Sequence, residues 1–353
     1  MINCQKKFSR GLIIGMPSVL ILMPTFINCG IKNKFSFKPF ILKKIVIKLV
    51  LKDSFGRPVE NLRISVTQRC NFKCFYCHHE GEDYASGNEM LPEEIERIVR
   101  VAASLGIYGI KLTGGEPLIR SDIVEIVQRI SHIPGIKDTS MTTNGYLLAE
   151  HAKHLKEAGL RRVNVSLDTL NPEKFKAITG TSFHEKVING IIEALRVGLS
   201  PVKVNMVLLK DINDDEVNDM IRFAEENGLI LQIIELERAG EDDFYKRYHA
   251  SLDHVERELE DKAHRIIVRR MHHRRKYILD NGAEIEIVKP MHNSEFCLHC
   301  NRIRLTSDGK LKPCLFRNDN LVDLLSPIRN GANDEYLKSL FIEAVKRRKP
   351  YFM

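Results

Sequence analysis

Short runs rich in β-branched residues alternate with amphipathic helical stretches between Asn61 and about Glu237, which gives six β-α units in sequence. This alternation favours a parallel sheet with right-handed crossovers, so we predict an α/β fold built on an open or incomplete barrel. Functional side chains should then gather at the C-terminal ends of the strands. The predicted strands are Leu62–Thr67, Tyr108–Thr113, Asp138–Thr142, Arg162–Leu167, Val202–Leu208 and Leu231–Leu236. The predicted helices are Pro92–Leu105, Asp122–His132, Ala149–Ala158, Phe183–Val197 and Asp214–Asn227.

The pattern changes after about Gly240. Arg265–Leu279 and Ala283–Val288 are predicted to form a hairpin around the turn Asp280–Gly282. A final helix is predicted at Asn333–Arg348. We therefore divide the chain into an N-terminal extension (1–50), a partial barrel (51–240) and a smaller C-terminal α+β layer (241–353) that closes the open side of the barrel.

The basic charge of the chain comes from its N-terminal segment. Residues 1–50 hold nine basic and no acidic residues, whereas the rest of the chain holds 45 basic and 46 acidic ones. The body therefore lacks the basic face of a duplex-binding protein. The apolar run Gly11–Met23 is too short to span a bilayer. We expect a cytoplasmic protein with neither nucleic acid nor membrane as a partner, and interpret residues 1–50 as a dispensable extension or an over-extended reading frame.

Six of the eight cysteines fall into two groups, Cys70-x3-Cys74-x2-Cys77 and Cys297-x2-Cys300-x13-Cys314. This spacing brings thiolates within reach of one metal centre. A zinc site built from the two x2 pairs is an alternative, but it would leave Cys70 and Cys314 without a role. Two groups of three suit two four-iron clusters, each with one iron free to bind a small ligand.

Two further features suggest a cavity for charged ligands. The second predicted strand ends in Gly114-Gly115-Glu116-Pro117, where glycines permit close backbone approach and Glu116 offers an anionic partner for an ammonium group. Cations at strand ends, such as Arg63 and Lys203, are costly inside a barrel unless they meet an anion such as a triphosphate. For any single cation, a surface salt bridge is the alternative interpretation.

The first cysteine group, with Tyr76 before its last cysteine and Gly-Gly-Glu-Pro one β-α unit later, resembles the signature of the radical S-adenosylmethionine (SAM) superfamily. This resemblance implies an incomplete TIM-like barrel of six β-α units, a [4Fe-4S] cluster on Cys70, Cys74 and Cys77, and SAM bound to the free iron. Residues 51–316 are similar throughout to the GTP 3′,8-cyclase family, also called molybdenum cofactor biosynthesis protein A. Agreement includes the segments Leu62–Thr67, Arg161–Asp168 and Cys300–Leu305.

The resemblance also implies roles for individual positions. A second [4Fe-4S] cluster is implied on the second cysteine group, with its free iron binding the guanine base. The positions that match SAM contacts are Tyr76, Gly115, Glu116 and Ser166. The positions that match GTP contacts are Arg63, Lys111, Thr142, Lys203, Arg302 and Arg304. No further catalytic side chain is assigned.

The implied activity is that of a lyase in the first step of molybdenum cofactor synthesis. A 5′-deoxyadenosyl radical removes the hydrogen from ribose C3′ of GTP, and the carbon radical attacks guanine C8 to give 3′,8-cyclo-7,8-dihydro-GTP. The implied partners are a reductant protein and cyclic pyranopterin monophosphate synthase, which takes the product onward. The sequence leaves the oligomeric state open, with a homodimer among the options.

Three positions depart from the bacterial form of the family. Lys111 stands where arginine is usual, which keeps the charge but loses the planar two-pronged grip on phosphate. Glu237 stands where a methionine near SAM is expected, and the chain ends in Lys349–Met353 instead of a double glycine. Lys111 and this ending resemble archaeal members more closely.

Some residues are interpreted more plainly. We read His78, His79 and the pair His272-His273 as solvated histidines, and Asp168 as a helix cap or a partner of a neighbouring residue. The basic run Arg269–Lys276 is read as a solvated hairpin face, with a phosphate-facing role as the alternative. Two rival functions are a radical SAM peptide-modifying maturase with an auxiliary cluster and a zinc-stabilised nucleic-acid-binding protein.

Overall fold

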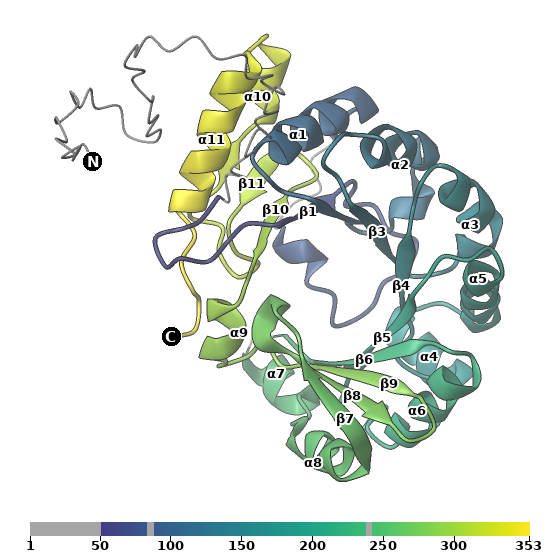
Figure 1. Cartoon of the computed structure of the whole chain (residues 1–353). Helices are drawn as coiled ribbons and strands as arrows, with labels where there is room; N and C mark the ends of the chain where they lie inside the picture. The colour runs from purple at the N-terminus through teal and green to yellow at the C-terminus, as the bar shows by residue number, and fades with distance from the viewer. Residues whose placement is uncertain (1–50, 83–87, 238–241) are drawn as a thin grey trace, which may run out of the picture. The chain divides into compact units, whose positions relative to one another are not determined.

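A sheet with eight neighbouring parallel strands forms the centre of the computed structural model, which describes residues 51–82, 88–237 and 242–353. Six of these strands follow one another in sequence order, as predicted, and two strands from the C-terminal part flank them. The six are β1 (Asn61–Ser65), β2 (Gly109–Thr113), β3 (Asp138–Thr143), β4 (Arg162–Ser166), β5 (Val202–Leu208) and β6 (Ile230–Glu235). The flanking strands are β10 (Arg302–Leu305) beside β1 and β9 (Glu284–Val288) beside β6. In the described part of the chain β9 and β10 do not pair, so the barrel stays open (Figure 1).

The helices between these strands lie on the outside of the partial ring (Figure 1). They are α1 (Pro92–Ser104), α2 (Ile123–Ser131), α3 (Leu148–Glu157), α4 (Pro172–Thr179), α5 (His184–Arg196) and α6 (Val217–Glu226). In α1, Pro92 occupies the first turn and the apolar residues Ile95, Ile98 and Val99 are buried. The helix α4 was not predicted. It is capped at its N-terminus by Asn171, whose side chain accepts hydrogen bonds from two backbone amides, and it ends at Gly180, which has a φ of 72°.

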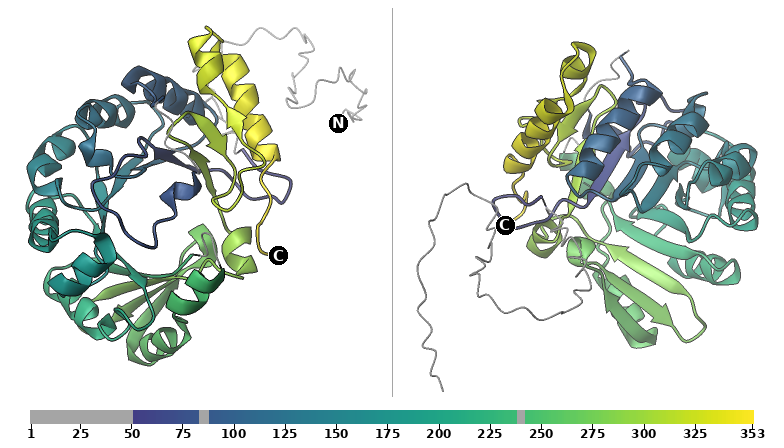
Figure 2. Two further views of the ribbon diagram at one scale, coloured as in Figure 1. Left: turned by 180° about the vertical axis from the view of Figure 1, so that it is seen from behind. Right: turned by 45° about the horizontal axis from the view of Figure 1, so that its top comes forward.

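The C-terminal part extends the sheet at both edges (Figure 2). Next to β9 lie β8 (Arg275–Leu279) and β7 (Ala263–Val268), and next to β10 lie β11 (Lys310–Lys312) and β12 (Val322–Asp323). The remaining helices are α7 (Asp242–Tyr248), α8 (Asp253–Lys262), α9 (Ser294–Leu298), α10 (Leu325–Arg329) and α11 (Asp334–Lys346). None of the helices in the described ranges is long and apolar enough to cross a membrane.

The predicted hairpin around Asp280–Gly282 is present, because β8 and β9 pair in antiparallel fashion. The prediction that Arg265–Leu279 is one strand was wrong. A turn with the 3-10 segment η3 (Met271–His273) divides it into β7 and β8, and the amide of Arg269 donates to the carbonyl of Arg274 across this turn. Both His272 and His273 have positive φ, a conformation that cannot continue a strand.

The register of the central strands aligns the predicted cations. Arg63 on β1 is paired with Arg304 on β10 and with Lys111 on β2, and Asn164 on β4 is paired with Lys203 on β5. Because side chains alternate between the faces of a sheet, residues in one row share a face. The three cations on β10, β1 and β2 therefore point into the barrel together.

Candidate active site

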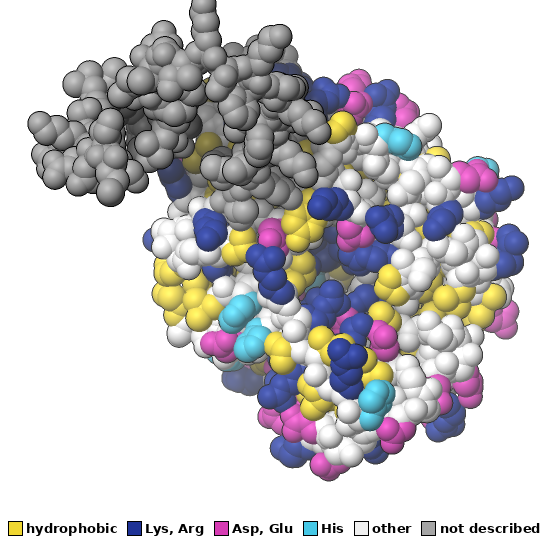
Figure 3. All heavy atoms as spheres, viewed as in Figure 1, with side chains coloured by type: hydrophobic (Ala, Val, Ile, Leu, Met, Phe, Trp, Pro, Cys, Tyr) yellow, Lys and Arg dark blue, Asp and Glu magenta, His cyan; other side chains and the backbone are white. Residues whose placement is uncertain are grey.

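A cavity fills the inside of the barrel and is lined by residues from all eight parallel strands. Figure 3 shows Lys and Arg side chains gathered around the hollow in the middle of the view. All six cysteines of the two predicted groups line this one cavity. The structure therefore brings the two predicted groups together at one cavity.

The first triad lies in the loop that follows β1. Cys70, Cys74 and Cys77 are free thiols. The amides of Phe72 and His79 donate to the sulfur atoms of Cys70 and Cys77 at 3.4 and 3.5 Å. Burial raises the pKa of each thiol, and repulsion by the other thiols adds to the rise at Cys74. Three converging thiols that resist ionisation on their own suit a cationic metal centre, which would stabilise the thiolates.

The Gly-Gly pair after β2 packs against the chain that leads to this triad. A Cβ atom on Gly114 would lie 2.2 Å from the carbonyl oxygen of Thr67, and one on Gly115 would lie 2.2 Å from that of Arg69. The amide of Gly115 also donates to the Thr67 carbonyl at 2.7 Å. The lack of a side chain at Gly114 and Gly115 thus lets this segment pack closely against the loop that carries Cys70. Both glycines also line the cavity.

Glu116 is placed differently from the expectation. It is fully buried, is not part of the cavity wall, and accepts hydrogen bonds from Thr143 Oγ1 (2.7 Å), the Asn144 amide (2.6 Å) and the Leu118 amide (3.0 Å). Burial raises its pKa to about 7. The Asn144 side chain donates to Asn71 Oδ1 at 2.8 Å. The Glu116 carboxylate therefore supports the cysteine loop through Asn144 and does not face an ammonium group in the cavity.

The other positions expected near SAM do line the cavity, namely Tyr76, Gly115 and Ser166. The Tyr76 hydroxyl donates to Asp168 Oδ2 at 2.6 Å, and the Val207 amide donates to Asp168 Oδ1 at 2.8 Å. Burial raises the pKa of Asp168 to about 6. Asp168 thus fixes the Tyr76 ring, in line with its reading as a partner of a neighbouring residue.

A buried carboxylate that was missed joins two of the predicted cations. Glu80 accepts a hydrogen bond from Arg63 Nε at 2.9 Å and from Arg304 at 2.6 Å. Attraction by these guanidinium groups outweighs the effect of burial and holds the pKa of Glu80 well below its usual range. Glu80 lies only three residues after Cys77 in a strained turn with φ 56°. No sequence pattern indicated this contact, because it depends on the loop folding back over the barrel mouth.

Three other predicted cations, of which Lys203 is buried and Lys111 and Arg302 are half-buried, have too little negative charge around them. Burial lowers the pKa of Lys111 well below its usual value, and that of Arg302 to about 9, with repulsion from neighbouring cations as a further cause. Burial also lowers the pKa of Lys203 to about 7, although its ammonium group lies 2.6 Å from Glu286. The hydroxyl of Thr142 lines the same cavity and has no hydrogen-bond partner among the described residues. Such a wall favours a polyanionic ligand.

The reading of Arg269–Lys276 as a solvated face was wrong for His272, which is buried, and for two of its arginines. Arg269 and Arg274 line the cavity and form ion pairs with Glu286. The Arg274 side chain is 11% exposed, burial lowers its pKa to about 10, and its Nε has no hydrogen-bond partner in the described structure. The turn between β7 and β8 points these two side chains inward, whereas Arg275 pairs with Glu260 outside the cavity. Arg162, also not predicted, lines the cavity and pairs with Asp138.

The second triad lies around α9 and β10. Cys297, Cys300 and Cys314 are free thiols. Burial raises the pKa of Cys314, and repulsion from Cys300 and Cys297 adds to this. At Cys300 burial has the same effect, but the positive charges of Arg348 and Arg302 outweigh it and lower the pKa. This set of three thiols therefore also suits an iron–sulfur cluster.

Comparisons with known proteins agree with this arrangement. Residues 64–224 match the Radical SAM superfamily, and residues 229–353 match the family described as Molybdenum Cofactor Synthesis C. A protein named probable GTP 3′,8-cyclase from Thermococcus kodakarensis is 53% identical over 86% of this chain and 100% of its own length. One of the same name from Methanocaldococcus jannaschii is 51% identical over 86% of this chain and 99% of its own length. The chain belongs to the GTP 3′,8-cyclase family.

The fold of this GTP 3′,8-cyclase family member is also found in a solved structure of another protein. Streptococcus suis SuiB bound to S-adenosylmethionine matches with a TM-score of 0.58 and 20% sequence identity, over 81% of this chain and 69% of SuiB. At this identity the likeness concerns the fold alone. It agrees with the incomplete TIM-like barrel that the sequence predicted.

The structure locates the positions at which this chain departs from the bacterial form of the family. The ammonium group of Lys111 lies 2.6 Å from Asn164 Oδ1, and Glu237 lines the cavity beside His78 at 3.5 Å. In the C-terminal segment, Lys349 and Tyr351 line the cavity. This ending therefore reaches the same cavity without a double glycine.

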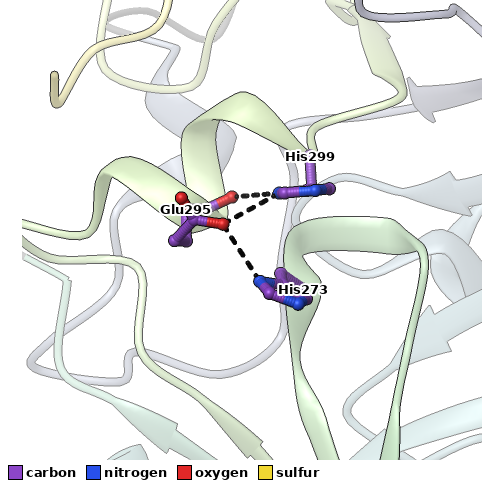
Figure 4. A group of neighbouring side chains, drawn as sticks. All are labelled: His273, Glu295 and His299. Carbon is purple, nitrogen blue, oxygen red and sulfur yellow. Dashed lines mark hydrogen bonds and ion pairs between the residues drawn. The ribbon is translucent and has the colours of Figure 1, made fainter.

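A second group of ligand-type side chains lies on the surface near α9. The Nδ1 atoms of His273 and His299 lie 3.1 and 3.5 Å from the same carboxylate oxygen of Glu295 (Figure 4). All three residues are exposed. The group ties η3 to α9, so His273 is solvated as expected. His272, in contrast, is buried and stacks on Phe296 with ring centroids 3.9 Å apart.

Proposed function

We propose that the cavity holds SAM and GTP between the two cysteine triads, for the conversion of GTP to 3′,8-cyclo-7,8-dihydro-GTP. The enzyme is a radical SAM lyase of molybdenum cofactor biosynthesis, and GTP is its substrate. The observation that carries the proposal for the site is the shared cavity: two triads of free thiols line it together with a group of buried cations.

The first triad is proposed to hold a [4Fe-4S] cluster with SAM on its free iron. Such a cluster supplies the electron for reductive cleavage of SAM, which provides the radical that abstracts hydrogen. The residues of this chain position and shield the ligand. Tyr76, fixed by Asp168, and Ser166 form the wall of the cavity near this triad, and Gly115 allows close backbone approach.

The second triad is proposed to hold a second [4Fe-4S] cluster whose free iron binds the guanine base. The triphosphate then lies against the cations of the wall, where their buried charge is neutralised. Besides the predicted contacts, Arg269 and Arg274 belong to this group because they line the same cavity. The proposed GTP-binding residues are Arg63, Lys111, Thr142, Lys203, Arg269, Arg274, Arg302 and Arg304.

A peptide-modifying maturase is the alternative, and a solved neighbour is SuiB bound to precursor peptide SuiA, with a TM-score of 0.55 and 18% identity. Three observations speak for the nucleotide instead. The C-terminal part carries only three cysteines, two half-buried arginines lie on β10 between them, and the curated relatives with about half of their residues identical are named for GTP. A zinc-stabilised nucleic-acid-binding protein does not fit membership of the family.

The wider biochemical setting is also proposed. A reductant protein delivers electrons to the first cluster, and cyclic pyranopterin monophosphate synthase consumes the product. We propose a cytoplasmic enzyme with the barrel (51–240) and the C-terminal part (241–353) as its two functional regions, and a homodimer as the state to examine.

Anaerobic incubation of the reconstituted protein with GTP, SAM and a strong reductant tests the proposal. We expect 5′-deoxyadenosine to form only when GTP is present, together with the cyclised nucleotide. Metal analysis should give about eight irons per chain, as two four-iron clusters require. Turnover with peptides but not with GTP would favour the maturase, and one zinc without iron would contradict both enzymes.

A further inference from the structure

Two buried arginines lie against the backbone of the second triad. Arg57 donates from Nη1 to the carbonyl oxygen of Cys297 at 2.8 Å, and Arg348 donates from Nη2 to that of Cys300 at 2.6 Å. The two side chains are only 6% and 1% exposed. Arg57 precedes β1 and Arg348 follows α11, so opposite ends of the described chain meet at this triad.

A single carboxylate holds the two arginines together. Asp53 Oδ2 lies 2.8 Å from Arg57 Nε and 3.0 Å from an Nη atom of Arg348, and the Asp53 side chain is fully buried. Asp53 Oδ1 accepts the amides of Phe55 and Arg57, each at 3.0 Å, which closes the turn that presents Arg57. Each guanidinium thus reaches from this one carboxylate to one cysteine carbonyl.

The charges of this group do not balance. Two guanidinium groups share one carboxylate, which leaves an excess of one buried positive charge. Arg348 Nε also has no hydrogen-bond partner among the described residues. An uncompensated buried charge is strongly unfavourable, so a negative group must lie nearby when the protein is loaded. The thiolates of a cluster on the second triad provide that negative charge.

We infer that Arg57 and Arg348 are positioning residues for the second iron–sulfur cluster, which they anchor and whose reduction potential they raise. This inference rests on the proposed second cluster. The two guanidinium groups donate hydrogen bonds to the backbone of Cys297 and Cys300 and so fix these ligands before iron binds. Residues that orient metal ligands in this way affect metal affinity. A positive charge beside a cluster favours its reduced, more negative state and so raises its potential.

The test compares two substitutions that change the local charge in opposite directions. Arg348→Met keeps most of the side-chain volume and removes one positive charge, and Asp53→Asn keeps the Oδ1 acceptor of the turn and removes the negative charge. In the anaerobic holoenzyme, we expect the potential of the second cluster to fall in Arg348→Met and to rise in Asp53→Asn. The cluster signal that changes when SAM is added belongs to the first cluster, and the reduction potential of this cluster should be the same in both variants as in the wild type.

Arg329→Met is the matched control, because Arg329 pairs with Glu94 and does not line the cavity. It should leave both potentials and the iron content unchanged. We also expect faster iron loss to a chelator from Arg348→Met than from the wild type, stopping near four irons per chain because the first cluster stays in place. If Arg348→Met does not fold, Asp53→Asn still gives the sign of the shift, and the conservative Arg348→Lys, which keeps the positive charge, should leave the potential of the second cluster close to that of the wild type.

The outcomes separate the inference from the proposed function. A wild-type protein that binds only one cluster overturns the proposed second cluster itself. A wild type with two clusters, combined with equal potentials in all variants or with shifts of the same sign in Arg348→Met and Asp53→Asn, overturns the role of the arginines alone.

Discussion

At the scale of single residues, the cavity wall contains some charged side chains that could be predicted from the sequence and others that could not. Arg63, Lys111 and Lys203 were expected here because they match GTP contacts of the family, and a cation at a strand end inside a barrel is costly unless it meets an anion. Glu80 and Arg274 could not be predicted, since each reaches the cavity through a turn with positive φ nearby. Their placement depends on contacts between distant segments, which local patterns do not record.

Arg274 gives the sharpest residue-scale prediction. Arg274→Met should weaken GTP binding by roughly 10- to 100-fold, because it removes a charge-assisted contact of about 1.5–3 kcal/mol to the triphosphate. SAM binding should be unchanged. Arg275→Met is the matched control, since the neighbouring side chain points outside and pairs with Glu260. Calorimetric titration with GTP checks this, and equal losses in both variants would count against a phosphate contact at Arg274.

The lowered pKa of Lys203 leads to a prediction of how GTP binding depends on pH. Its pKa in the free protein is lowered to about 7, chiefly by burial, so the ammonium form is lost as the pH rises through this value. A bound polyanion favours the charged form and raises that pKa, so binding takes up a proton. GTP affinity should therefore fall between about pH 7 and pH 9. Lys203→Arg stays charged and should flatten the profile measured by titration; an unchanged slope would assign it to another group.

At the scale of elements, the sequence predicted the six central strands closely and missed the helix that supports the first triad. The carbonyls of Ile178 and Thr179, at the end of α4, accept the amides of Phe75 and Lys73 at 3.1 and 2.9 Å. In this short helix the apolar residues recur only a few times, so their spacing alone did not distinguish a helix from a loop. The Asn171-Pro172 start was the available signal.

Asn171→Ala tests the support that α4 gives to the loop. Loss of the capping side chain should reduce the free energy of unfolding by about 1 kcal/mol and speed iron loss from the first triad. Asn333→Ala removes the equivalent cap of α11 and should cost similar stability without affecting the first triad. Thermal unfolding and chelator kinetics measure both effects. Equal iron loss in the two variants would mean that α4 stabilises the whole protein and not the loop.

At the scale of the whole molecule, strands from the C-terminal part complete both edges of the barrel. The alternation of the first two thirds predicted the partial barrel, but no local signal showed that β10 pairs with β1 and β9 with β6. Parallel pairing joins strands far apart in the chain, so hydrophobic periodicity cannot specify the partner. The two regions of the sequence thus share one sheet.

A fragment of residues 1–240 should therefore fail as an independent domain. Removing β9 and β10 leaves the backbone edges of β1 and β6 unpaired, which favours association between chains. We expect the fragment to elute as aggregates in size-exclusion chromatography, whereas the full chain elutes as a defined species. A monomeric fragment with cooperative thermal unfolding would show that the barrel is stable without its C-terminal strands.

The placement of Arg57 and Arg348 at the same triad has a consequence for biosynthesis. During translation Cys297, Cys300 and Cys314 all leave the ribosome before Arg348, whose guanidinium donates to the Cys300 carbonyl. The second thiol set therefore gains this support only when the segment that follows α11 has been made. A product truncated before Arg348 should keep all its cluster ligands and yet retain iron less firmly at the second set.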